Sequence, residues 1–130
     1  MTNVLGDLKF VVIETNFDMR NMTLKILREA GANRLEAFSA LMSAITFLRE
    51  FQVDLIISEM EQTPIDGVGF AHALRSGKVK MNAKTPLLLV SATKDIDKIK
   101  EAIAAGATNI IVKPYSANDL IKKVKQTLGR

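Results

Sequence analysis

Short apolar runs alternate with segments of helical spacing along the whole chain of 130 residues. Four of the five runs are continuous, which is typical of strands that helices cover on both faces of a sheet. The run at 34–38 alternates and indicates a half-exposed edge strand. The predicted strands span residues 10–13, 34–38, 54–57, 87–90 and 110–112.

The segments between these runs carry apolar residues at helical steps. Gly31 is expected to end the first helix, Ser39 to cap the second, and Gly106 to follow the fourth. Ser116 with Asp119 three residues on resembles a capping box for the fifth. The stripes of the first, second, fourth and fifth helices are Met19, Thr23, Ile26, Leu27 and Ala30; Leu41, Ala44, Ile45 and Leu48; Ile96, Ile99, Ala102 and Ile103; and Leu120, Ile121, Val124 and Leu128. The third helix is expected from about Val68 to Arg75, ending near Gly77.

Strand and helix alternating five times predict an α/β fold, a doubly wound five-stranded parallel sheet with helices on both faces. The length suits one domain over residues 1–130. Ligands of such sheets bind beyond the carboxyl ends of the strands, so those ends are where a site is expected.

Composition removes several classes of function. The chain has no Cys, which excludes disulfides, thiolate metal sites and Cys nucleophiles. The single His72 excludes a multi-His zinc site and is expected on the surface of the third helix. The apolar runs are far shorter than the roughly 20 residues that span a bilayer. Residues 1–7 lack the pattern of a signal peptide, so the expected location is cytoplasmic.

The net charge of +4 divides unevenly, with 6 basic and 9 acidic residues in 1–65 and 12 basic and 5 acidic residues in 66–130. Solvation of helix surfaces is the favoured explanation of the basic half, and a partner with an acidic face is the alternative. Nucleic acid is not expected as a partner because aromatic side chains do not interleave with the basic ones. The lysines on the fourth and fifth predicted helices and just before them are Lys94, Lys98, Lys100, Lys122, Lys123 and Lys125.

Polar residues stand at the end of each central strand. Because the carboxyl ends of parallel strands meet at one edge, two carboxylates, hydroxyl groups and one ammonium should converge there. These ends are Glu14-Thr15, Ser58-Glu59, Ser91 and Lys113-Pro114.

In this order and at these positions, the motifs make the chain resemble the receiver domains of bacterial response regulators, over nearly its whole length and most of all the single-domain chemotaxis type. The resemblance implies a flavodoxin-like sheet of order 2-1-3-4-5. The motifs are Phe10 to Thr15 with Met19-Arg20, Asp54 to Glu59, Pro64 to Gly67, Pro86 to Ala92, Ala105 to Ala107 and Val112 to Ser116.

The resemblance also implies roles for single residues. In the family an acidic pair and an Asp hold a divalent metal, that Asp takes the phosphoryl group from a phosphohistidine, and a Ser or Thr and a Lys bind the phosphoryl oxygens. Ser91 and Lys113 occupy these last two positions, and Glu14 takes the first acidic one. Pro114 implies the cis Lys-Pro bond usual in the family.

Four features depart from the family pattern. Thr15 stands where the second acid belongs, and Glu59 stands at the phosphoacceptor position. The loop at 60–63 lacks the usual Met-Pro, with Pro64 one residue late. Ile110 occupies the position where many members carry a switching Tyr or Phe.

These departures predict weaker chemistry. A Glu nucleophile is one methylene too long, and misplacement of about 1 Å can cost roughly a hundredfold in rate. Thr15 removes a charged magnesium ligand, so a metal site on Glu14 and Glu59 should be weak or absent. The same reasoning predicts that Glu59 pairs with Lys113 and accepts a hydrogen bond from Ser91, in place of a phosphoryl group.

The sequence therefore predicts a stand-alone receiver-like signalling domain that binds a partner protein and is not an enzyme, with no cofactor or weakly bound magnesium. The expected partner surface is the fourth helix, fifth strand and fifth helix. Three alternatives stay open: a working phosphoreceiver assisted by a divalent metal, a small magnesium-dependent hydrolase using Glu14 and Glu59, and a cyclic-dinucleotide or nucleic-acid binding module.

Overall fold

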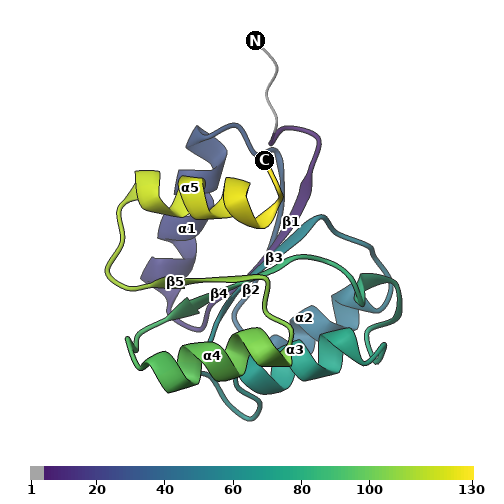
Figure 1. The fold of residues 1–130 in the computed structure, drawn as a ribbon. Helices are drawn as coiled ribbons and strands as arrows, with labels where there is room; N and C mark the ends of the chain where they lie inside the picture. Colours follow the sequence, from purple (N-terminus) through teal and green to yellow (C-terminus); the bar gives the residue numbers. More distant parts are fainter. Residues whose placement is uncertain (1–4) are drawn as a thin grey trace.

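The computed structural model describes residues 5–130 as one parallel sheet of order β2-β1-β3-β4-β5 with helices on both faces (Figure 1). This confirms the predicted doubly wound α/β fold and its strand order. The strands are β1 (Lys9–Ile13), β2 (Arg34–Phe38), β3 (Leu55–Glu59), β4 (Leu87–Ser91) and β5 (Asn109–Val112). The helices are α1 (Phe17–Glu29), α2 (Leu41–Leu48), α3 (Gly67–Arg75), the 3₁₀ turn η1 (Lys80–Asn82), α4 (Ile96–Ala105) and α5 (Ala117–Thr127).

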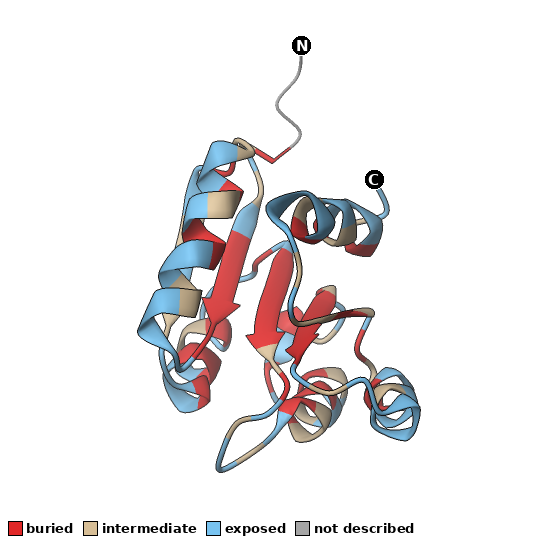
Figure 2. Cartoon of the chain, turned by 90° about the vertical axis from the view of Figure 1, so that its left-hand side faces the viewer, coloured by how far each residue is buried: buried red, intermediate tan, exposed pale blue. Residues whose placement is uncertain are grey.

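The sheet separates two hydrophobic cores. Helices α1 and α5 cover one face, and α2, α3 and α4 cover the other (Figure 1). Successive side chains of β1 alternate between the cores: Val11 and Ile13 pack with α2 and α3, whereas Phe10 and Val12 pack with α1 and α5. The central strands are buried along their length, as Figure 2 shows, while β2 is half-exposed as an edge strand.

Helix ends follow the local sequence with one exception. The predicted capping box of Ser116 and Asp119 is present at α5, and Gly106 follows α4 with a φ of 121°. The prediction that Ser39 caps α2 is wrong, since the cap is Ala40, which has no side-chain bond. Ser39 lies one residue before the position from which a hydroxyl accepts the first-turn N–H groups.

The predicted apolar stripe of α4 is only partly buried. Ala102 and Ala105 face the core, whereas Ile96 and Ile103 are 64% and 46% exposed. Two small residues let α4 lie close to α3, and that orientation turns the larger isoleucines toward solvent. The apolar spacing thus located the helix, but only part of its apolar stripe faces the core.

Two polar side chains hold the amino-terminal edge of the sheet. Asn82 is fully buried, and its amide group makes four hydrogen bonds. Arg75 donates to the chain around the starts of β4 and β5. The Asn82 partners are Val53 N, Leu48 O, Phe51 O and Thr85 Oγ1; the Arg75 partners are Gly106 O, Ala83 O, Thr85 O and Thr108 Oγ1.

Among residues 5–130, none of the helices has the length and apolar character needed to cross a membrane. His72 is exposed on α3, as predicted.

Candidate functional site

Four strands deliver polar side chains to one edge of the sheet. Glu14 follows β1, Glu59 ends β3, Ser91 ends β4 and Lys113 follows β5. Ser91 and Glu14 are buried, whereas Glu59 and Lys113 are half-buried. The carboxyl ends of the parallel strands therefore bring together the residues that the sequence singled out.

Lys113 pairs with Glu14. The distance from Lys113 Nζ to Glu14 Oε1 is 3.4 Å, and Glu14 Oε2 accepts a hydrogen bond of 3.1 Å from the Asn16 N–H. Burial alone would raise the pKa of Glu14. Hydrogen bonds with Glu59 and the Asn16 N–H, together with the Lys113 charge, outweigh it and lower that pKa. These contacts therefore favour the ionised form of Glu14.

Glu59 turns toward the loop after β1. Its Oε1 accepts the Thr15 N–H at 3.0 Å and also the Thr15 hydroxyl. Burial raises the pKa of Glu59, and so does its hydrogen bond with the Glu14 carboxylate, while the two bonds from Thr15 oppose the rise. The pKa shifts of the two carboxyl groups are therefore opposite in direction, lowered at Glu14 and raised at Glu59.

Ser91 is bonded to a residue that the sequence analysis did not single out. The Ser91 hydroxyl donates to Glu61 Oε2 at 2.8 Å, and the Ala92 N–H donates to Glu61 Oε1 at 2.9 Å. The predicted network of Glu59, Ser91 and Lys113 is therefore wrong. Each of the three has a different partner, because Glu59 reaches sideways to β1 and Glu61 reaches across the end of β4.

Two further side chains order the surrounding loops. Arg20 Nη1 donates to Glu14 O at 2.8 Å and to Thr15 O at 3.4 Å, which fixes the loop between β1 and α1. Gln62 Nε2 donates to Ser58 Oγ at 2.9 Å and to Glu59 O at 2.7 Å. The sequence analysis named Arg20 in one of the family motifs, but it did not predict a role in the site for Arg20 or Gln62. Apolar periodicity could not indicate either role, because both side chains bond mainly to main-chain carbonyl groups.

Two further features predicted from the family resemblance are Ile110 and the cis peptide bond before Pro114. Ile110 is 6% exposed and belongs to the core beneath α4. The predicted cis bond between Lys113 and Pro114 is present, and the bond between Thr63 and Pro64 is also cis.

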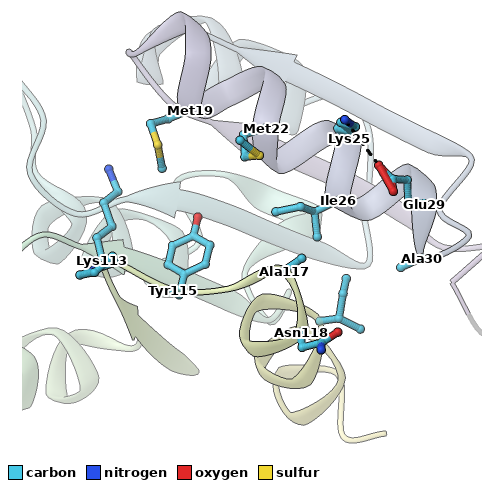
Figure 3. Close-up of a pocket in the computed structure, with 12 residues that line it drawn as sticks. Met19, Met22, Lys25, Ile26, Glu29, Ala30, Lys113, Tyr115, Ala117 and Asn118 are labelled. Carbon is cyan, nitrogen blue, oxygen red and sulfur yellow. Dashed lines mark ion pairs between the residues drawn. The ribbon is translucent and has the colours of Figure 1, made fainter.

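Two hollows flank these residues. One, of about 740 Å³, lies over the strand ends; Thr15, Glu59 and Glu61 are among its lining residues. The other, also about 740 Å³, is a largely apolar groove between α1 and α5, with Lys113 and Tyr115 toward one end (Figure 3). Glu59 therefore lines the first hollow together with Thr15 and Glu61, and Lys113 lines the second, whereas Glu14 and Ser91 line neither.

The donors of the site do not fit a strong divalent-cation site. Within the described part of the chain, there is no group of three or more His, Cys, Asp or Glu side chains placed to hold a metal ion. Glu14 is paired with an ammonium group, and Glu59 carries the raised pKa. Magnesium prefers several carboxylate and water oxygens in a strict octahedron, which these two engaged side chains supply poorly.

The model of the response regulator receiver domain family matches residues 10–125. The chain belongs to this family. Among curated relatives, the chemotaxis protein CheY-3 of Vibrio cholerae is 23% identical over 124 residues, covering 95% of this chain and 94% of that protein. The chemotaxis protein CheY of Pseudomonas aeruginosa is 26% identical over 124 residues, covering 95% and 98%. The family assignment confirms the predicted two-component signalling class.

Solved receiver structures share the fold over nearly their full length. Vibrio cholerae CheY4, a chemotaxis response regulator, superposes with a TM-score of 0.83 at 25% identity, covering 92% of this chain and 98% of that one. The receiver domain of the Pseudomonas aeruginosa sensor histidine kinase PA1611 superposes with a TM-score of 0.82 at 17% identity, covering 96% and 100%. That structure holds a magnesium ion in its active-site cleft.

Proposed function

We propose that this receiver domain acts by binding a partner protein and is not phosphorylated at Glu59. The observation that carries the proposal is the engagement of Glu59, whose Oε1 accepts both donors of Thr15 while the carboxyl group faces Glu14. A carboxylate nucleophile needs an ionised, unshielded oxygen in line with the phosphorus. Glu59 offers a raised pKa and an oxygen already occupied by two donors.

The charges around Glu14 and Thr15 also disfavour binding of the divalent metal that phosphorylation would need. Receivers of this family use a divalent metal to neutralise the phosphoryl oxygens, as the resemblance implies. Here the ammonium of Lys113 lies 3.4 Å from Glu14 and offsets the charge that would attract the cation. Thr15, in place of a second acid, donates a hydrogen bond instead of adding a charge. The proposal therefore includes magnesium binding that is weak at most.

The proposed partner surface consists of α4, β5 and α5. Ile96 and Ile103 expose apolar side chains on the same side of α4, about two turns apart. β5 is an edge strand of the sheet. Lys94, Lys98 and Lys100 alternate on this segment with Asp95, Asp97 and Glu101, and Lys98 lies 3.9 Å from Glu101. An exposed apolar ridge bordered by charges of both signs fits a partner with an apolar face and a polar margin.

Function by binding also accounts for the site better than the enzyme alternative. A hydrolase needs separate acid and base groups that both reach the substrate. Glu59 instead accepts both donors of Thr15, and Glu14 is held by the Asn16 N–H and by Lys113. The proposal is a non-enzymatic signalling domain whose expected compartment is the cytosol.

Intact mass after incubation with acetyl phosphate and magnesium tests the absence of phosphotransfer. We expect no gain of a phosphoryl group on the wild-type chain. The matched control is the triple variant Thr15→Asp, Glu59→Asp and Glu61→Ala, which restores the family's acids, frees the Ser91 hydroxyl and should gain label. Stoichiometric labelling of the wild-type chain that disappears in Glu59→Gln would overturn the proposal.

A second comparison tests the partner surface. A partner protein isolated with the wild-type chain should lose binding to Ile103→Glu and keep binding to Met42→Glu. Met42 is 50% exposed on α2, so the control places the same charge on an equally exposed apolar site elsewhere. Equal binding by both variants would exclude α4 as the contact surface.

A further inference from the structure

Two hydrogen-bond donors at the end of β4 converge on one carboxylate. The fully buried Ser91 hydroxyl donates to Glu61 Oε2 at 2.8 Å, and the Ala92 N–H donates to Glu61 Oε1 at 2.9 Å. Each oxygen of Glu61 thus has its own donor, a two-point arrangement that holds an anion firmly. We refer to the Ser91 hydroxyl and the Ala92 N–H as the Ser91–Ala92 donor pair.

The loop between β3 and α3 is built to place Glu61 there. On one side of Glu61, the Met60 N–H donates to Val90 O at 2.8 Å; on the other, Gln62 is tied to Ser58 and Glu59. The loop closes where the Gly67 N–H donates to Met60 O at 2.7 Å. A Cβ on Gly67 would lie 2.9 Å from Met60 Cα, so the closure depends on glycine. The position of Glu61 therefore follows from an ordered loop.

The donor pair is continuous with the partner surface. The Thr93 N–H donates to Ser91 Oγ at 3.0 Å, and the Asp95 N–H donates to Thr93 Oγ1 at 3.0 Å. Asp95 then caps α4 by accepting the Asp97 N–H at 3.0 Å. A group that fixes Ser91 therefore fixes the loop that sets the start of α4.

We propose that Glu61 is a built-in anionic ligand of the Ser91–Ala92 donor pair, which holds the loop at 92–95 in one conformation and keeps small tetrahedral oxyanions out. The proposal rests on the proposed function, because it explains how a domain that takes no phosphoryl group keeps this loop ordered. A carboxylate and a phosphate present similar oxygens to an O–H and an N–H donor, so removing Glu61 should open the pair to phosphate.

Amide NMR tests the occupancy. The Ala92 amide should be protected from hydrogen exchange in the wild-type chain. In Glu61→Ala its exchange should accelerate by about tenfold or more, since a hydrogen bond to a charged acceptor is lost. Glu61→Gln should lie between the two, because it keeps an acceptor oxygen without the charge. Glu50→Ala, which removes an exposed carboxylate elsewhere, is the control. An unchanged Ala92 amide in Glu61→Ala would overturn the proposal.

A titration with inorganic phosphate tests the exclusion. The Ala92 amide of Glu61→Ala should shift with phosphate, and adding Ser91→Ala to that variant should abolish the shift. The wild-type amide should not respond over the same range. Equal responses of the wild-type chain and Glu61→Ala, or no response of either, would show that Glu61 does not guard an oxyanion site. Both readouts omit a phosphodonor, so phosphorylation of Glu59 detected by mass would refute the proposed function alone.

Discussion

The pairing of Lys113 with Glu14 leads to the most direct energetic prediction. The ammonium lies 3.4 Å from Glu14 Oε1, with side-chain exposures of 28% for Lys113 and 8% for Glu14. The perturbations are Lys113→Met, which keeps the apolar stem, and Glu14→Gln, which keeps the shape and removes the charge. Each single change leaves its partner with an unpaired, largely buried charge, so the two effects should not add.

The size of the coupling follows from distance and burial. At 3.4 Å, with an effective dielectric constant of about 20, the Coulomb attraction is roughly 5 kcal/mol before desolvation is counted. Burial of Glu14 offsets much of this attraction. A hydrogen bond to a charged group retains about 1.5–3 kcal/mol net, so we expect a coupling free energy of that order.

Urea unfolding of the wild type, both single variants and the double variant measures this coupling. The control is the same cycle on Lys25 and Glu29, which are 4.0 Å apart with side chains 74% and 67% exposed (Figure 3). That exposed pair should couple by no more than about 0.5 kcal/mol. A cycle of Lys113→Met with Glu59→Gln should also give a smaller value, because those residues meet through Glu14. If the effects of Lys113→Met and Glu14→Gln on the unfolding free energy were additive, the direct pairing of Lys113 with Glu14 would be refuted. An equally large coupling between Lys113 and Glu59 would refute it as well.

Three further predictions concern single features. A carboxyl group with a raised pKa contributes stability that is present at low pH and lost as pH rises through that pKa. Glu59→Gln should therefore be more stable than the wild type above the raised pKa of Glu59 and no more stable well below the ordinary value of 4.5. Urea unfolding across pH measures this difference. Asn82→Ala should lower the unfolding free energy by about 3 kcal/mol, since it removes four hydrogen bonds, three of them buried. Calorimetry should find magnesium binding no tighter than about millimolar, and a tight site would contradict the reading of Glu14 and Glu59.

The fold was predictable because its signal is local. Continuous apolar runs marked the four strands buried on both faces, and their ends placed Glu14, Glu59, Ser91 and Lys113 at one edge, as observed. Local patterns failed where side-chain size decides, as at α4, where Ala102 and Ala105 face the core. Apolar periodicity does not record that a small residue lets two helices approach.

The partners within the site were not predictable from the same signals. Three carboxylates lie within reach of the donors, and their pairing depends on the path of the loop at 60–66. That path is fixed by long-range contacts, such as Met60 N–H to Val90 O and Gln62 to Ser58. The late Pro64 marked the loop as unusual, but it carried no information on where Glu61 would point. Residue type therefore located the site, and loop geometry assigned its bonds.

A built-in ligand has a consequence that a bound phosphoryl group does not. A ligand shifts a conformational equilibrium by the difference in its affinity for the two states, and its effect changes when its concentration changes. Glu61 is part of the chain, so its concentration at the Ser91–Ala92 donor pair is constant. It can bias the loop at 92–95 toward one conformation, but it cannot by itself switch that loop. Under the proposed function, regulation must then enter through the amount of the protein, through the partner that binds α4, or through an anion able to displace Glu61.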